Sequence, residues 1–368
     1  MWIHEYKDWT KFYWDIDSLS SKLSEVRYKQ GLLLGKMSSL GFELKQEASL
    51  SILTNDVMKT SSIEGENLNT QEVRSSIARK LGMDIAGLIP SKRNVDGIVD
   101  ILLDATQKYN EPLTKDRLFA WHSSLFPAGR SGMHKIIVAD WRNDKKGAMQ
   151  VISGVIGKQT VHFEAPSADR ISEEMNVFLN WFESENKIDP ILKAGIVHLW
   201  FITIHPFDDG NGRIARAITD MVLARAENIS NRFYSLSSQI ELDKNEYYNQ
   251  LESQQRSISD ITKWLLWFVE CIEGSISNAD EILSNVLLKA KIWDVINKNP
   301  VNERQRMVIN RMVESNFEGF MNTSKYAKMT KCSNDTALRD IQNLKSRKIF
   351  IQNKSGGRST SYRLNKDL

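Results

Sequence analysis

The stretch from His205 to Arg216 holds the residue types best suited to chemistry. It reads His-Pro-Phe-Asp-Asp-Gly-Asn-Gly-Arg-Ile-Ala-Arg. Its two glycines let the backbone approach a ligand closely. A helix that starts near Arg213 would direct its free amides and the positive end of its dipole into the same loop. We therefore expect an anionic ligand at this loop.

Four side chains add to this anion site. Asp209 offers a hard oxygen ligand for Mg²⁺, which takes one or two carboxylates besides phosphate oxygens. Arg213 and Arg216, three positions apart on one helix, can reach the same polyphosphate. His205, with an ordinary pKa near ~6.5, is suited to accept a proton at neutral pH. Together these groups indicate transfer at a phosphorus centre, where positioning and charge stabilisation supply most of the catalysis.

The stretch matches every specified position of H-x-F-x-[DE]-G-N-G-R-x-x-R, the signature of the Fic family, and the chain resembles that family over about residues 1–290. The resemblance implies a mainly α-helical, Fic-type domain with a β-hairpin flap. It also implies transfer of AMP from ATP to a Ser, Thr or Tyr hydroxyl of a protein, with release of pyrophosphate. ATP would be the substrate and Mg²⁺ the cofactor. The partners would be an unidentified target protein and the chain itself, through auto-AMPylation.

The same resemblance assigns roles to individual residues. His205 would deprotonate the target hydroxyl, and Asp209 would hold Mg²⁺ between the α- and β-phosphates. The residues implied in ATP binding are Glu64, Asp209, Gly210, Asn211, Gly212, Arg213, Arg216, Tyr248 and Gln255. For Tyr248 and Gln255, ordinary packing is an equally good interpretation.

A short hairpin is predicted between residues 132 and 166. Two β-branched patches, 135–138 and 150–153, have glycines between and after them. Such a hairpin can be purely structural, or it can hold an extended peptide by edge pairing. By the resemblance, the target segment would dock on Val151, Ile152, Ser153 and Gly154.

Residues 60–65, Thr-Ser-Ser-Ile-Glu-Gly, fit the pattern [ST]-x-x-x-E-[GN] of Fic proteins that restrain themselves. Alone the pattern is loose, because Gly65 is also a good helix terminator. With the signature downstream, the resemblance implies that Glu64 pairs with Arg216 and competes with the γ-phosphate of ATP. The α-phosphate would then be turned away from in-line attack, and the enzyme would be autoinhibited.

Apolar periodicity predicts a mostly helical chain. The expected helices lie near 19–33, 43–63, from 71 after a cap at Thr70, 94–109, 114–126, 170–184, 190–204, from 213, 244–256, 260–273 and 278–298. Asp189 and Pro190 are typical of a helix start, and His205 before Pro206 predicts a helix end. We expect an accessory helical region carrying the inhibitory motif at 1–90, a Fic catalytic domain at 91–298 and a further domain at 299–368.

The last segment is basic. Residues 300–368 hold 14 Lys+Arg against 6 Asp+Glu, so a net charge of +8 is hidden in the overall +3. Three predicted helices and a hairpin resemble a C-terminal winged helix-turn-helix. In a DNA-bound form Arg339, Lys345 and Arg358 would face the nucleic acid. Protein contact or dimerisation through the same fold is the open alternative.

Composition sets the remaining bounds. The 41% apolar and 26% charged residues exclude wholesale disorder. Two distant cysteines favour a reducing compartment, and neither a signal peptide nor a bilayer-spanning run is visible. We expect a soluble, cytoplasmic protein without a membrane partner, and a homodimer is compatible with the sequence. The alternatives are a DNA-binding regulator with a nucleotide-sensing Fic domain, or a Fic enzyme that removes AMP or transfers from another nucleotide-linked donor.

Overall fold

The computed structural model describes residues 1–83, 87–145, 147–155, 158–184, 187–298, 300–313, 317, 319–353 and 360–365. It divides the chain into two compact units. The first combines Met1–Ser39 with Ser49–Ala279, and the second combines Leu40–Ala48 with Asp280–Leu368. In the described residues the strands form only two-stranded sheets. The expectation of a mainly α-helical fold is confirmed.

The elements of the first unit, with the two helices that run on into the second, follow in chain order. They are η1 (Ile3–Glu5), α1 (Ile16–Ser38), α2 (Phe42–Ile63), α3 (Thr70–Lys80), α4 (Arg93–Gln107), α5 (Lys115–Leu125), β1 (Arg130–Ser131), β2 (His134–Lys135), β3 (Gln150–Ser153), β4 (Thr160–Glu164), η2 (Ala168–Arg170), α6 (Ile171–Glu183), α7 (Pro190–Ile204), α8 (Asn211–Glu227), α9 (Leu236–Leu242), α10 (Lys244–Gln255) and α11 (Thr262–Lys298). Within the described chain, no helix is both long enough and apolar enough to cross a bilayer.

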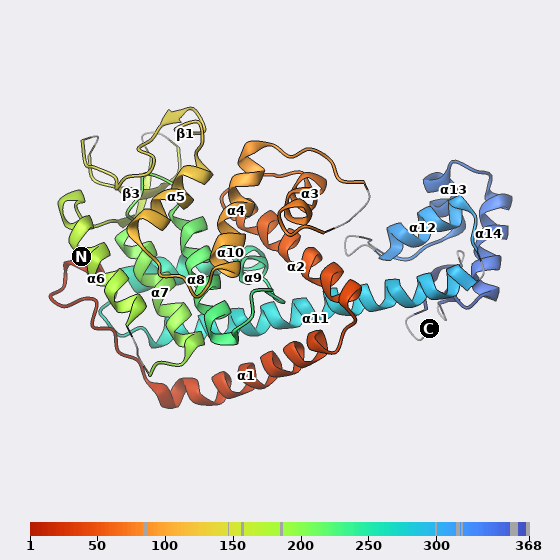
Figure 1. Ribbon diagram of the computed structural model, residues 1–368, viewed down its shortest axis with the longest axis horizontal. Coiled ribbons are helices and arrows are strands. Elements are labelled where there is room, and N and C mark those ends of the chain that lie inside the picture. Colours follow the sequence, from red (N-terminus) through yellow and green to blue (C-terminus); the bar gives the residue numbers. More distant parts are fainter. Residues whose placement is uncertain are drawn as a thin grey trace. The chain divides into compact units, whose positions relative to one another are not determined.

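Helices α7 and α8 lie among the other helices of the first unit (Figure 1). Nearly every residue of α7 is buried, as its all-round apolar sequence predicts. Asp189 caps its start by accepting a hydrogen bond from the amide of Ile191 at 2.8 Å. The helix ends at Ile204, and His205 takes the left-handed conformation with φ 51°. Both ends therefore confirm the prediction.

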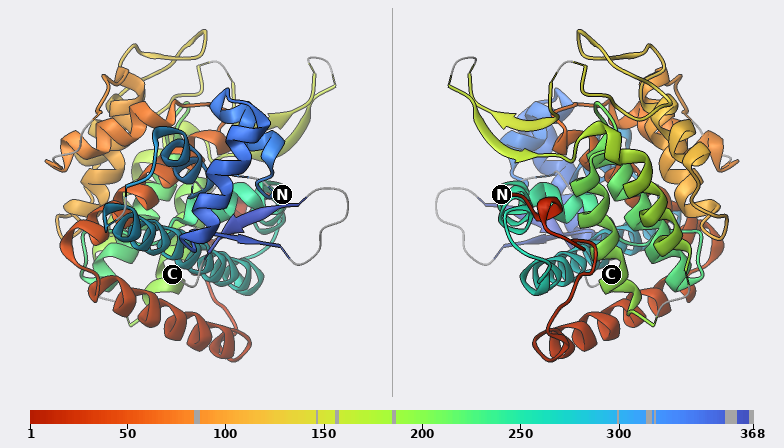
Figure 2. Two further views of the ribbon diagram at one scale, coloured as in Figure 1. Left: turned by 90° about the vertical axis from the view of Figure 1, so that its right-hand side faces the viewer. Right: turned by 90° about the vertical axis from the view of Figure 1, so that its left-hand side faces the viewer.

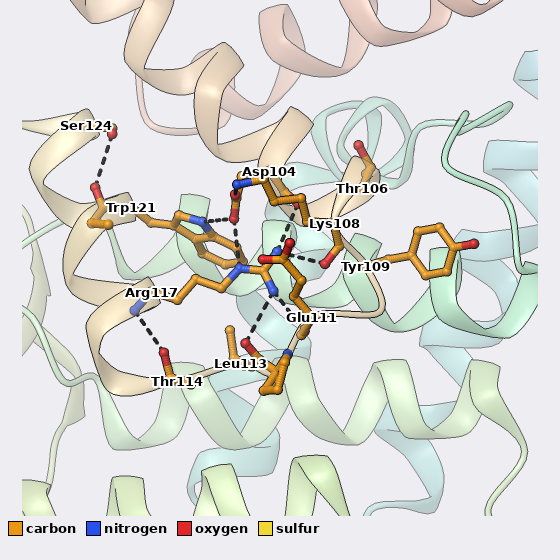
Figure 3. Close-up of polar contacts among 12 residues, drawn as sticks. Asp104, Thr106, Lys108, Tyr109, Glu111, Leu113, Thr114, Arg117, Trp121 and Ser124 are labelled. Atoms are coloured by element: carbon orange, nitrogen blue, oxygen red, sulfur yellow. Dashed lines mark hydrogen bonds and ion pairs between the residues drawn. The ribbon is translucent and has the colours of Figure 1, made fainter.

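Side-chain hydrogen bonds tie helices α4 and α5 together (Figure 3). The carboxylate of Asp104 accepts hydrogen bonds from Trp121 Nε1 at 2.7 Å and from Arg117 Nε at 2.8 Å. Arg117 also donates to backbone carbonyls at the end of α4, including that of Lys108. This network holds α5, and with it His122, next to the loop between α7 and α8.

Strand β3 of the hairpin pairs with a different segment from the one that the sequence suggested. Strand β3 pairs with β4 in antiparallel register, with a bulge between Val151 and Ile152, and this ribbon projects from its unit (Figure 2). Residues 136–138 form no strand. The Ile137 amide donates to Asp208 at 2.8 Å, and the Ala139 amide donates to His122 Nδ1 at 3.3 Å. These two amides therefore bond to the loop between α7 and α8 and to α5.

Two further helix predictions are wrong in detail. Helix α3 is capped by Asn69, whose side chain accepts from the amides of Gln71 and Glu72, so the cap lies one residue before Thr70. Helix α11 is continuous where two helices were predicted. Gly274 lies inside this continuous helix. A Cβ at this position would overlap the side chain of Gln239. The glycine thus permits close packing.

The second unit has its own core. Its further elements are α12 (Glu303–Val313), α13 (Thr323–Thr330), α14 (Asn334–Ser346), β5 (Phe350–Gln352) and β6 (Tyr362–Leu364). Met321 adds an antiparallel bridge to Tyr362. Ile292, Ile296 and residues of all three helices share one apolar cluster. These elements follow the order expected for a winged helix-turn-helix, whose assignment stays a prediction. Arg358 lies outside the described residues.

Candidate active site

The loop between α7 and α8 is braced from inside. Asn211 Oδ1 accepts from the Phe207 amide at 3.0 Å, and Asn211 Nδ2 donates to the Phe207 carbonyl at 2.8 Å. The Phe207 ring is fully buried and stacks on His122, with centroids 4.2 Å apart. Gly210 has φ 83°, and a Cβ there would meet the Phe126 ring. The Asn211 side chain therefore shapes the loop, while its backbone amide lies at the start of α8.

His205 is oriented as a proton acceptor. Its Nδ1 lies 3.2 Å from the carbonyl of Ile202. Because a carbonyl only accepts, Nδ1 carries the proton and Nε2 keeps its lone pair. Burial lowers the pKa of His205 to about 4, and the positive charge of Arg142 acts in the same direction. The imidazole is therefore neutral at pH 7.

Arg142, which the sequence did not single out, holds the backbone of this histidine. Its Nε donates to the His205 carbonyl at 2.8 Å, and its amide donates to the Pro206 carbonyl at 2.9 Å. Arg142 also bonds Asp144 at 2.9 Å and the Pro166 carbonyl. The residue is 3% exposed. It lies 63 positions from His205, and no local pattern marks it.

The two aspartates of the loop point to different places. Asp208 accepts from the Ile137 amide and so fixes the loop. The Asp209 carboxylate accepts from Ser131 and from the Gly210 amide, yet its side chain is 39% exposed. The described residues contain no cluster of three or more metal-ligating side chains. A single accessible carboxylate beside an anion site still fits Mg²⁺, which takes its other ligands from phosphate and water.

The first two arginines of α8 are buried, and part of their hydrogen-bonding capacity is unused. Arg213 donates from Nη1 to Glu66 at 2.9 Å. Arg216 donates from Nε to Thr60 Oγ1 at 2.7 Å and from Nη2 to Glu64 Oε1 at 2.7 Å. Among the described residues, Arg213 Nε and Arg216 Nη1 are buried without a hydrogen-bond partner. Buried unpaired donors are costly, so their presence fits an anionic ligand.

Glu64 lies against the first turn of α8. A Cβ on Gly212 would overlap Glu64 Oε1, so the carboxylate occupies the space that this glycine leaves free. The start of a helix stabilises a carboxylate for the same reason that it stabilises a phosphate. Glu64 thus lies where the sequence places an anionic ligand.

Helix α10 carries Tyr248 and Gln255, the two other residues expected near ATP from the sequence. Tyr248 is 41% exposed, and partial burial together with the charge of Glu64 raises its pKa to about 12. Gln255 is buried at the end of the helix. On the flap Val151, Ile152 and Ser153 are exposed along β3, and Gly154 follows with φ 97°.

This braced loop places a neutral imidazole at one end and a cationic helix start at the other. Residues 112–223 match the Fic/DOC family, and residues 2–83 match a domain of unknown function (DUF4172). The Fic/DOC match runs from α5 into α8 and therefore includes the loop that carries His205 and Asp209.

Relatives with curated names are distant. Over 172 residues the chain is 26% identical to protein adenylyltransferase fic-1 of Caenorhabditis elegans, covering 46% of this chain and 31% of that protein. Over 238 residues it is 24% identical to protein adenylyltransferase Fic of Nematostella vectensis, covering 60% of this chain and 47% of that protein. The chain therefore spans less than half the length of either relative. The crystal structure of a Fic family protein from Desulfovibrio desulfuricans G20 superposes with a TM-score of 0.51 at 18% identity, covering 93% of this chain and 95% of that one.

Proposed function

We propose that this chain is an autoinhibited protein adenylyltransferase that moves AMP from ATP to a Ser, Thr or Tyr hydroxyl of a protein and releases pyrophosphate. The observation that carries the proposal is the state of His205. Its Nε2 is a free proton acceptor on a fixed loop, and the neighbouring helix start holds two arginines with unpaired buried donors.

In the proposed reaction Nε2 of His205 accepts the proton of the target hydroxyl. The hydroxyl oxygen bonds to the α-phosphorus, the bond from that phosphorus to the β-phosphate oxygen breaks, and pyrophosphate leaves. Arg213 and the first amides of α8 hold the phosphates. Asp209 is the residue that would hold Mg²⁺, which neutralises phosphate charge when bound.

The restraint is proposed to act through Arg216. Glu64 accepts from Nη2 of this guanidinium, and Thr60 holds its Nε. A γ-phosphate that sought the same donor would have to displace the carboxylate. With Glu64 in place the triphosphate would be misplaced, and an error near 1 Å costs roughly a hundredfold in rate.

Labelled ATP tests both parts of the proposal. AMP incorporation is measured for the wild type, Glu64→Gly and the double variant Glu64→Gly with His205→Ala. We expect strong incorporation only in Glu64→Gly. Glu241→Gln is the matched control, because Glu241 bonds Lys59 and Ser62 of the same helix α2 and leaves Arg216 untouched. Equal incorporation by Glu64→Gly and the wild type would exclude the restraint.

DNA binding by the second unit is a second candidate function. Arg339 and Lys345 are exposed on α14, the helix expected to enter a groove. A gel-shift assay with duplex DNA compares the wild type with Arg339→Ala and Lys345→Ala. A shift that both variants weaken, and that salt weakens further, supports this function. A wild-type chain that shifts no duplex at low salt excludes it.

A further inference from the structure

Three polar side chains of the flap region form a hydrogen-bonded chain outside the loop between α7 and α8. Ser153 Oγ lies 2.6 Å from His162 Nε2, and His162 Nδ1 lies 2.6 Å from Glu252 Oε2. The serine belongs to β3, the histidine to β4 and the glutamate to α10. Ser153 and His162 are 9 positions apart in the sequence, and His162 and Glu252 are 90 positions apart.

The direction of these two hydrogen bonds follows from their acceptors. A carboxylate only accepts, so the Nδ1 of His162 that faces Glu252 carries the proton. The Nε2 atom is then left with its lone pair toward the serine, and the Ser153 hydroxyl is the donor. A serine, an imidazole and a carboxylate in this order are the arrangement that activates a hydroxyl for nucleophilic attack.

Glu252 is itself held in place. Its other oxygen, Oε1, accepts from Arg256 Nε at 3.0 Å, and Arg256 Nη2 donates to the Val161 carbonyl at 3.0 Å. The Arg256 guanidinium also lies over the ring of Trp2, 4.4 Å from its centroid. Each carboxylate oxygen therefore has its own partner. Although partial burial raises the pKa of Glu252, its bonds to His162 and Arg256 lower that pKa overall and keep the carboxylate ionised.

We propose that Ser153 is a second nucleophilic centre, which takes the acyl group of an activated carboxylic ester. The Ser153 Oγ bonds to the acyl carbon, the bond from that carbon to the leaving oxygen breaks, and the hydroxyl proton passes to His162 Nε2 and then to the leaving alkoxide. The products are an acyl-serine and an alcohol. Ser153 is exposed, so an ester reaches it from solvent. This centre does not depend on the AMP transfer proposed above.

The test uses p-nitrophenyl acetate and the full chain. We expect release of one equivalent of p-nitrophenolate, with the acetyl group on Ser153 located by mass spectrometry of tryptic peptides. Ser153→Ala abolishes this modification. His162→Gln and Glu252→Gln slow it, the first by roughly 100-fold, because general-base assistance contributes about 10²–10⁴-fold. Thr160→Ala is the matched control, because Thr160 faces Ser153 across the hairpin and should leave the rate unchanged.

Two outcomes would overturn the proposal. One is acetylation confined to lysines or to His162 itself. The other is a Ser153 acetylation rate that is equal in the wild type and His162→Gln, which would mean that the serine is merely exposed. Circular dichroism of each variant verifies that the helical fold is intact, and the acylation rate of Thr160→Ala shows that the hairpin tolerates substitution.

Discussion

Glu64 and Arg216 form an ion pair with a distance of 2.7 Å between Oε1 and Nη2, across 152 positions of sequence. Glu64 follows the last turn of α2, and Arg216 lies in the second turn of α8. The guanidinium is 2% exposed and also donates twice to Thr60. The pair therefore fixes the end of one helix over the start of another, where the phosphates of a nucleotide are expected.

Glu64→Gln should release the restraint only in part. The amide oxygen still accepts from Arg216, but the charge is lost, and a hydrogen bond to a charged partner contributes about 1.5–3 kcal/mol. We expect AMP incorporation that rises about tenfold or more over the wild type and stays below that of Glu64→Gly. Initial rates with labelled ATP measure it, and a rate equal to that of the wild type would contradict the electrostatic explanation.

Arg142→Lys should lower the rate without abolishing ATP binding. Lysine offers no planar set of donors that reaches the His205, Pro166 and Asp144 acceptors together. His205 would then be less firmly held in its left-handed conformation. In the Glu64→Gly background we expect kcat to fall about tenfold or more, as general-base catalysis depends on geometry, with KM for ATP little changed. A fall in kcat/KM that comes from KM alone would contradict this positioning role.

Three buried histidines should make the unfolding free energy fall between pH 6.5 and pH 4, and Asp220, whose pKa burial raises to about 8, offsets part of this fall. Burial lowers the pKa of His198 to about 3 and the pKa values of His122 and His205 to about 4. The unfolded chain takes up these protons near pH 6.5, whereas the folded chain takes them up only near pH 4 at His122 and His205 and near pH 3 at His198. Each histidine therefore costs up to about 1.4 kcal/mol per pH unit as the pH falls through this window.

Urea unfolding at pH 7.5, 6.0 and 5.0 measures this pH dependence. His198→Gln should be less stable at pH 7.5, because Thr219 and Tyr247 lose their imidazole partner. It should also show a smaller loss of stability on acidification. An unchanged slope in His198→Gln would contradict the assignment.

Asp209→Asn should remove AMP transfer while leaving stability nearly unchanged. In Asp209 one oxygen accepts from the Gly210 amide and the other from Ser131. The asparagine oxygen can keep the Gly210 amide while its Nδ2 donates to the Ser131 hydroxyl oxygen, but the charge that a hard cation requires is lost. Asp208→Asn is the neighbouring control, since Asp208 accepts from the Ile137 amide. Incorporation is measured in the Glu64→Gly background over a Mg²⁺ titration. Wild-type magnesium dependence in Asp209→Asn would exclude Asp209 as the ligand.

The sequence by itself determined the features that depend on neighbours in the chain. Asp189 and Pro190 start α7, Pro206 ends it, and the glycines of the following loop leave room for close approach. These effects act within a few residues, so local chemistry predicts them. The family signature lies in one such stretch, which is why the class of protein was visible before the fold.

Only the tertiary structure decided which distant groups meet. The β3 strand pairs with β4, while the amides of residues 137 and 139 bond to Asp208 and His122. Arg142 reaches the His205 carbonyl, and Glu252 reaches His162 across 90 positions. Such contacts depend on how whole helices and hairpins pack, and no local pattern encodes that packing.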